Sequence, residues 1–181
     1  MFFVVKLTSN ERGGDFGKKI GITVLILGVI IGGLYFFVKF NPPLELGTLG
    51  SSGDNKSVVI GVGNKGISEI TILDVLVNDN ENPTKTKVQV SNALQGFIIT
   101  DNFNSSESKK YGFRNLEDTT IKVEKYLFDK LKNSDDNMTA NKDEVYGVSV
   151  LYTEEIFKVH IKYSYFGITF RETIQLINSF D

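Results

Sequence analysis

The sequence predicts a mainly β protein: an N-terminal transmembrane helix followed by an antiparallel immunoglobulin-like β-sandwich with at most one short helix. Three observations predict this class. Residues 20–40 form an apolar run that carries no charged residue through Val38. Short segments rich in Val, Ile and Thr then recur between turn-forming residues, which is typical of a sandwich. The chain has 181 residues and no cysteine, so a hydrophobic core without disulfides must hold the domain.

The apolar run predicts a membrane anchor with a cytoplasmic N-terminus. At about 1.5 Å per residue, it is long enough to cross a hydrocarbon core about 30 Å thick. Basic residues gather before it: Lys6, Arg12, Lys18 and Lys19 precede the run, and Lys39 follows it. The positive-inside rule therefore places the C-terminal domain outside the cell membrane. A cleaved signal peptide is typically shorter and ends at a small-residue site, and the core helix of a small domain is amphipathic, so both alternatives fit less well.

The chain accordingly divides into four parts. Residues 1–19 are a cytoplasmic lead, 20–40 the transmembrane anchor, 41–56 a spacer with a candidate first strand, and 57–181 an extracytoplasmic β-sandwich domain. The Pro42-Pro43 pair is expected to end the helix, because proline removes a backbone donor and its ring clashes with the preceding turn.

Two glycines inside the anchor, Gly28 and Gly32, match the G-x-x-x-G pattern. This pattern lets the backbones of two membrane helices approach closely, so it indicates self-association through this face. The alternative is the ordinary abundance of glycine in membrane helices.

Strand-like segments follow one another through the rest of the chain. They are expected at 44–49, 57–63, 67–78, 84–90, 94–100, 119–123, 145–151, 157–165 and 168–177, with one short helix at 124–132. In the segment 84–90, Lys85, Lys87 and Gln89 alternate with Thr86 and valines, so these three are expected to face solvent.

The last two segments form the clearest element, a hairpin with a two-residue turn at Phe166-Gly167. The expected pairs are Tyr165 with Ile168, Tyr163 with Phe170, Ile161 with Glu172, and Val159 with Ile174. The apolar residues of both arms then lie on one face in register, with Glu172 as the exception.

One glycine motif has the spacing of a dinucleotide-binding loop: Gly61, Gly63 and Gly66 match G-x-G-x-x-G. That loop works by opening a helix whose N-terminus meets the pyrophosphate. The residues after Gly66 are typical of a strand instead, so the motif predicts a turn.

A polar segment resembles an EF-hand loop. Its candidate oxygen ligands are Asn133, Asp135, Asn137, Thr139, Asn141 and Glu144, at positions 1, 3, 5, 7, 9 and 12 of the loop. Glu144 would bind calcium through both oxygens. However, position 1 is not Asp, and Met138 stands where the EF-hand has its glycine, so a solvated loop is the favoured interpretation.

No catalytic, cofactor-binding or metal-binding residues are assigned, and the prediction is a protein that is not an enzyme. The chain has one histidine, His160, and no cysteine, so a histidine-based triad would have to use His160. In the hairpin this residue lies opposite Thr173, on the face away from Tyr163, with no partner for general base chemistry. No basic patch suits nucleic acid.

Three blocks of sequence carry a family resemblance: IGVGNKGISEITILDVLVND, VSNALQGFIITDNF and VHIKYSYFGITFRETIQL. Together with the basic lead and single anchor, they resemble the small single-pass, functionally uncharacterised membrane-anchored proteins of Bacillus-like Gram-positive bacteria. The resemblance implies an envelope protein and no particular activity.

The predicted function is a non-enzymatic, membrane-anchored interaction or scaffold module of the bacterial cell envelope, by analogy with other sandwich folds. Its expected partners are membrane lipid through the anchor, and an envelope protein or cell-wall component. The alternative is a calcium-dependent ligand-binding or envelope-stress sensor module that uses the 133–144 loop, and a hydrolase comes third.

Overall fold

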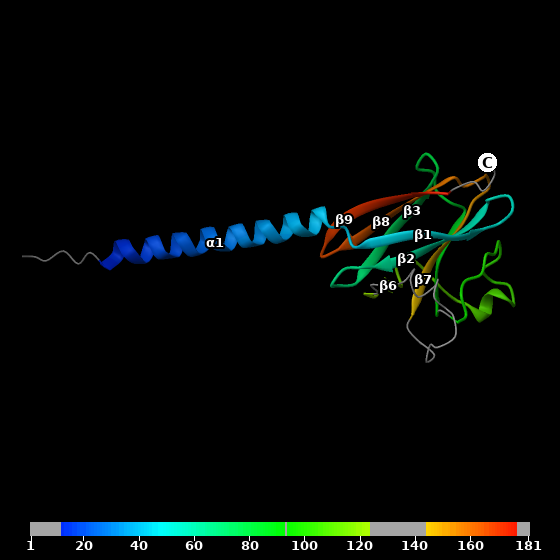
Figure 1. Ribbon diagram of the computed structural model, residues 1–181, viewed down its shortest axis with the longest axis horizontal. Helices are drawn as coiled ribbons and strands as arrows, with labels where there is room; N and C mark the ends of the chain where they lie inside the picture. The colour runs from blue at the N-terminus through cyan, green and yellow to red at the C-terminus, as the bar shows by residue number, and fades with distance from the viewer. Residues whose placement is uncertain (1–11, 93, 124–143, 177–181) are drawn as a thin grey trace, which may run out of the picture. The chain divides into compact units, whose positions relative to one another are not determined.

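The computed structural model describes residues 12–92, 94–123 and 144–176 (Figure 1). The chain forms two compact units, Met1–Asn41 and Pro42–Asp181. The first holds one apolar helix, and the second holds two antiparallel sheets. The expected mainly β class, with a sandwich after an N-terminal apolar helix, is confirmed.

Helix α1 runs from Arg12 to Phe40. It begins before residue 20, so part of the expected lead is helical. Its segment Gly17–Phe40 is long and apolar enough to cross a membrane, a property that membrane anchors and signal sequences share. At its end, the backbone N–H and the side-chain Nδ2 of Asn41 both donate to the Phe37 carbonyl, at 3.1 and 2.8 Å. Two prolines then prevent a further turn.

The sandwich consists of two sheets, called sheet A and sheet B. Sheet A has the order β1 (Leu44–Ser51), β2 (Ser57–Asn64), β7 (Val145–Leu151), β4 (Lys85–Ser91), β5 (Gly112–Arg114). Sheet B has the order β6 (Thr120–Ile121), β3 (Ile70–Val77), β8 (Lys158–Tyr165), β9 (Ile168–Gln175). Besides α1, the described residues form one 3₁₀ turn, η1 (Ser108–Lys110). The helix expected at 124–132 lies outside the described residues.

The core between the sheets is built from valine and isoleucine on alternate strand positions. Sheet A contributes Val58, Ile60, Val62, Val88, Val148 and Val150, and sheet B contributes Ile70, Ile72, Val75, Val77, Val159 and Ile161, all at most 2% exposed. Burying each such side chain stabilises the fold by about 1.5–3 kcal/mol. These β-branched residues suit strands and supply the buried faces at the same time.

The terminal hairpin has the expected register. Strand β8 pairs with β9 through Tyr165 and Ile168, Tyr163 and Phe170, Ile161 and Glu172, and Val159 and Ile174. The turn residues Phe166 and Gly167 both have positive φ, at 50° and 73°. Two positive φ values are what a type I′ turn requires.

Strand β1 pairs with β2 along its length, with an irregularity between Thr48 and Gly50. The 41–56 region, expected as a spacer with a candidate first strand, therefore contains an edge strand of sheet A. The expected strand at 119–123 is reduced to the two residues of β6, which pair with the start of β3.

The strand expected at 94–100 does not form, and this is the main correction to the expected elements. Residues 96–101, called the strap, belong to no sheet and run over the outer face of sheet A. Alternate strap carbonyls accept hydrogen bonds from this face: Gly96 from Ser91 at 2.5 Å, Ile98 from Gln89 at 2.7 Å, and Thr100 from Ser57 at 2.9 Å. At these three carbonyls the strap is bonded by side chains instead of by a neighbouring strand.

Gln89 corrects a second expectation, because it is fully buried and does not face solvent. Its Oε1 accepts the Ile98 N–H at 3.0 Å, and its Nε2 donates to the Ile98 carbonyl and, at 2.6 Å, to Ser149 Oγ. The side-chain amide thus bonds both backbone groups of Ile98, as a neighbouring strand would. The alternation of residues 84–90 correctly placed Gln89 on the outer face of sheet A, but the strap covers that face.

Candidate functional site

The strap decides which sheet face a partner can reach. Gly47, Gly61 and Gly147 pair in a row across β1, β2 and β7 on the outer face of sheet A. A Cβ on Gly147 would lie 2.8 Å from the Phe97 ring, and one on Gly61 would lie 3.1 Å from Leu49. The chain can approach this closely only because glycine has no side chain. Much of the outer face of sheet A is therefore occupied by the protein itself.

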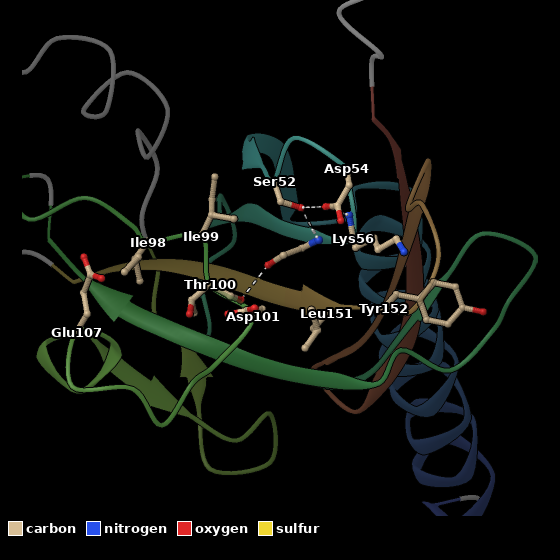
Figure 2. A pocket seen from close by; sticks show the side chains of 11 residues that line it. Ser52, Asp54, Lys56, Ile98, Ile99, Thr100, Asp101, Glu107, Leu151 and Tyr152 are labelled. Carbon is tan, nitrogen blue, oxygen red and sulfur yellow. Dashed lines mark hydrogen bonds between the residues drawn. The ribbon is translucent and has the colours of Figure 1, made fainter.

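A hollow of about 620 Å³ opens at one end of the strap (Figure 2). The β1–β2 turn lines it with Ser52, Asp54 and Lys56, followed by Ser57 at the start of β2. The remaining lining residues are Ile98, Ile99, Thr100 and Asp101 of the strap, together with Glu107, Leu151 and Tyr152. Its charged groups are thus three carboxylates and one lysine.

Hydrogen bonds inside the β1–β2 turn fix the polar wall of the hollow. Ser52 Oγ donates to Asp54 Oδ1 at 2.7 Å and accepts the Ser57 N–H at 3.0 Å. The bond from Ser52, followed by the bond from the Lys56 N–H, lowers the pKa of Asp54. These bonds favour the ionised carboxylate and rigidify the turn. The wall can contact a small polar group, and its serine–carboxylate pair, Ser52 and Asp54, takes part in the hydrogen bonds that hold the turn.

The outer face of sheet B is the second candidate surface, and it is called the open face. Its outward side chains are exposed or half-buried. Asp74, Lys162 and Arg171 form one cross-strand row, and Leu76, His160 and Thr173 form the next. Arg171 Nη1 donates to Asn80 Oδ1 at 2.9 Å, which orients its guanidinium group toward the 78–81 turn.

His160 joins the open face to that same turn. Its Nε2 lies 2.9 Å from the Asn78 carbonyl, and its Nδ1 lies 2.8 Å from Thr173 Oγ1. A carbonyl can only accept, so Nε2 carries a proton. When the imidazole is neutral, Nδ1 therefore accepts from the Thr173 hydroxyl. Nε2 therefore holds the turn and Nδ1 holds β9, so both ring nitrogens are engaged in structural hydrogen bonds.

Glu144 is the one candidate calcium ligand inside the described residues, since 133–143 lie outside them. Its Oε2 lies 2.7 Å from Lys122 Nζ and accepts from Tyr146 Oη at 2.9 Å. These two hydrogen bonds, the lysine's first, lower the pKa of Glu144. In this arrangement the carboxylate already has a cationic partner. Among the described residues, no group of His, Cys, Asp and Glu is placed to hold a metal ion.

The G-x-G-x-x-G motif spans the end of β2 and the turn that follows it, and it opens no helix, as expected. Gly61 and Gly63 lie within β2, and Gly66 lies in the connection to β3. The Gly66 N–H donates to Asn64 Oδ1 at 2.9 Å, so the amide is used within the turn.

Comparison with known proteins gives a single result. No family model, curated protein or solved structure matches the chain. The functions of the hollow and the open face therefore have to be inferred from their own residues.

Sequence reasoning missed the strap and the burial of Gln89, although a signal was present. Glycine within a strand often marks the close approach of another backbone. Gly61 and Gly147 lie in two segments that were correctly predicted as strands. Their presence there could have indicated that one face of those strands is covered.

Proposed function

We propose that this protein is a membrane-anchored, extracytoplasmic interaction or scaffold module of the bacterial cell envelope, without enzymatic activity. One observation carries the proposal: an apolar helix of membrane-spanning length ends immediately before a sandwich that has one covered and one open sheet face.

The distribution of basic residues supports a cytoplasmic N-terminus. Arg12, Lys18 and Lys19 lie in or just before the apolar part of α1, whereas Lys39 stands alone at its end and the next basic residue is Lys56. Lysine and arginine resist translocation, so the domain would be carried outward. Aromatic residues near the helix end, among them Tyr35, suit a membrane–water interface.

The strand order supports an immunoglobulin-like interaction domain. Immunoglobulin constant-type domains pair their strands A-B-E-D in one sheet and C-F-G in the other. Here β1-β2-β7-β4 faces β3-β8-β9 in the corresponding chain order, with β5 and β6 added between the fourth and fifth of these seven strands. Sandwiches of this kind commonly bind partners through a sheet face or loops, which is support by analogy of fold.

The open face is the proposed partner surface because its backbone is already paired and its side chains are accessible. Lys162 and Arg171 lie side by side on β8 and β9, and Asp74 is the acidic member of their row. The excess of positive charge in this row favours an acidic partner, such as a carboxylate-bearing or phosphate-bearing envelope component.

Self-association through Gly28 and Gly32 remains part of the proposal. Both glycines lie in α1, and a Cβ added at either would meet nothing within 4 Å in the single chain. A second helix could therefore approach either glycine. Replacing both with isoleucine should abolish helix association in a membrane two-hybrid assay, whereas Gly33→Ile, off this face, should not.

The calcium-dependent alternative has no described geometry in its favour. Glu144 is the residue that would have to bind the ion through both oxygens, and it is paired with Lys122. The proposal without a metal site is therefore preferred.

The membrane topology can be tested with epitope tags at both ends of the chain in intact cells. External protease should remove the C-terminal tag and leave the N-terminal tag in the membrane fraction. Protection of the C-terminal tag would refute the topology. Recovery of the domain in the medium without the N-terminal tag would identify the helix as a signal sequence.

The open face can be tested by co-sedimentation of the detergent-solubilised full chain with purified cell-wall material and with extracted envelope proteins. Lys162→Glu combined with Arg171→Glu should reduce binding at least as strongly as high salt does. Lys109→Glu combined with Lys110→Glu changes the same charge at η1 and serves as the matched control. Equal loss of binding in both pairs would show that only overall charge matters.

A further inference from the structure

Two turns at one end of the sandwich form a single apolar projection, called the tip and made of Ile67, Tyr165 and Phe166. The Ile67 N–H donates to Tyr165 Oη at 3.0 Å, which ties the β2–β3 turn to the β8–β9 turn. The ring of Phe166 lies 4.6 Å from that of Tyr165. Ile67 is 81% exposed, more than any other large apolar side chain in the described residues, and Phe166 is 56% exposed.

The backbone of Phe166 gives a second, independent indication that its side chain is used. It occupies the left-handed region with φ 50°, where bulky side chains are disfavoured and Asn or Gly is the common choice in this turn. The ring is not needed for the hydrophobic core, because most of it is exposed. Strained residues that persist at exposed positions often serve a function.

Chain length limits the distance between the last residue of the apolar helix and Pro43, which contacts the β2–β3 turn. Phe40 is the last residue of α1, and Pro43 lies three positions further on, so an extended chain separates the two by at most about 11 Å. The Pro43 carbonyl accepts the Lys65 N–H at 2.9 Å, and a Cβ on Gly66 would lie 2.9 Å from Pro43 Cβ. Ile67 directly follows Gly66, so the tip begins one residue from this contact with Pro43. This limit follows from chain length alone and holds for any orientation of the domain.

We propose that the tip inserts Ile67 and Phe166 into the headgroup region of the bilayer that holds α1, so that the domain contacts the membrane at a second point. The inference rests on the proposed membrane anchor. Headgroup layers add several ångströms on each side of the hydrocarbon core, which matches the short tether. Exposed apolar side chains on polar turns suit such an interface, because the Phe166 ring and Ile67 leave water while polar backbone groups remain hydrated.

Site-specific fluorescence tests this proposal without background, because the chain contains no cysteine. The full-length protein is reconstituted into vesicles of zwitterionic and anionic phospholipid, with an environment-sensitive label on one introduced cysteine. Ile67→Cys reports the tip, and Glu69→Cys gives a second reporter on the same turn. Gly53→Cys, in the β1–β2 turn at the other end of the sandwich with open space around it, is the matched control. Gly33→Cys reports the helix.

Nitroxide-bearing lipids should quench the labels at Ile67 and Gly33 and leave the label at Gly53 unquenched, with blue-shifted emission at Ile67. Quenching at Gly33 without quenching at Ile67 or Glu69 would overturn the tip proposal and leave the anchor intact. No quenching at Gly33 would overturn the anchor itself. A blue shift at Ile67 that depends on protein density and is insensitive to nitroxide lipid would assign the tip to contact with a second copy, which would also overturn the proposal.

Discussion

Replacing Gln89 with leucine should loosen the strap, because leucine keeps similar volume and removes three hydrogen bonds. The Ile98 N–H and carbonyl lose their partner, and Ser149 Oγ loses its donor. A buried polar group left without a partner costs about 1–3 kcal/mol. Two backbone groups would therefore cost about 2–6 kcal/mol if the strap stayed in place. If the strap lifts away from the sheet, water can bond these two groups and the cost is smaller. The expected loss in the free energy of unfolding is therefore about 2–4 kcal/mol.

Urea unfolding of the detergent-solubilised full chain measures this loss. Tyrosine emission is a usable signal because the chain has no tryptophan. Gln175→Leu is the matched control: it changes an exposed strand glutamine and should alter stability by less than about 0.5 kcal/mol. Hydrogen exchange at Ile98 should accelerate only in Gln89→Leu. If that variant loses less than about 0.5 kcal/mol and Ile98 stays protected, the assigned role of Gln89 is wrong.

Three further predictions concern other parts of the domain. Gly147→Ala should destabilise by about 1–3 kcal/mol in the same urea assay, because its Cβ would lie 2.8 Å from the Phe97 ring; Gly53→Ala, in open space, should be neutral, and a neutral Gly147→Ala would contradict the close packing of the strap. The lowered pKa of Glu144, caused first by Lys122, stabilises the fold above the ordinary glutamate pKa of about 4.3, and this contribution is lost as pH falls through the lowered value. The stability difference between the parent and Glu144→Gln should therefore shrink between pH 7 and pH 3, and a difference that grows on acidification would refute the assignment. Calcium should leave the thermal midpoint unchanged, whereas a concentration-dependent rise would establish the calcium-dependent alternative by mass action.

The elements with strong local signals could be predicted from the sequence. The β8–β9 hairpin was assigned with its register, because a two-residue turn and alternating apolar residues leave one consistent pairing. The apolar helix could also be predicted, but not its start at Arg12. Residues 12–19 are mostly polar, so a criterion based on hydrophobicity does not detect that they continue the helix.

The contacts between segments that are far apart in the chain could not be predicted from the sequence. The pairing of β2 with β7 joins residues far apart in the chain and has no local signal. The strap was predicted wrongly for the same reason: its short apolar run, Phe97–Ile99, fits a strand, yet its carbonyls bond the side chains of Gln89, Ser91 and Ser57. The tip is exposed apolar surface, which becomes informative only when the fold brings Ile67 and Phe166 together.

Glu172 interrupted the apolar pattern of the hairpin, and its position suggests what that interruption achieves. Strand β9 is the edge of sheet B in the described residues, and Glu172 points toward the interior side, opposite Ile161, where it is half-buried. An inward-facing charge on an edge strand discourages a second strand from adding to the sheet, because pairing would remove the carboxylate from water. With the proposed membrane anchor, copies would meet repeatedly in two dimensions, and this protection of the β9 edge would keep the sheets of neighbouring domains from joining.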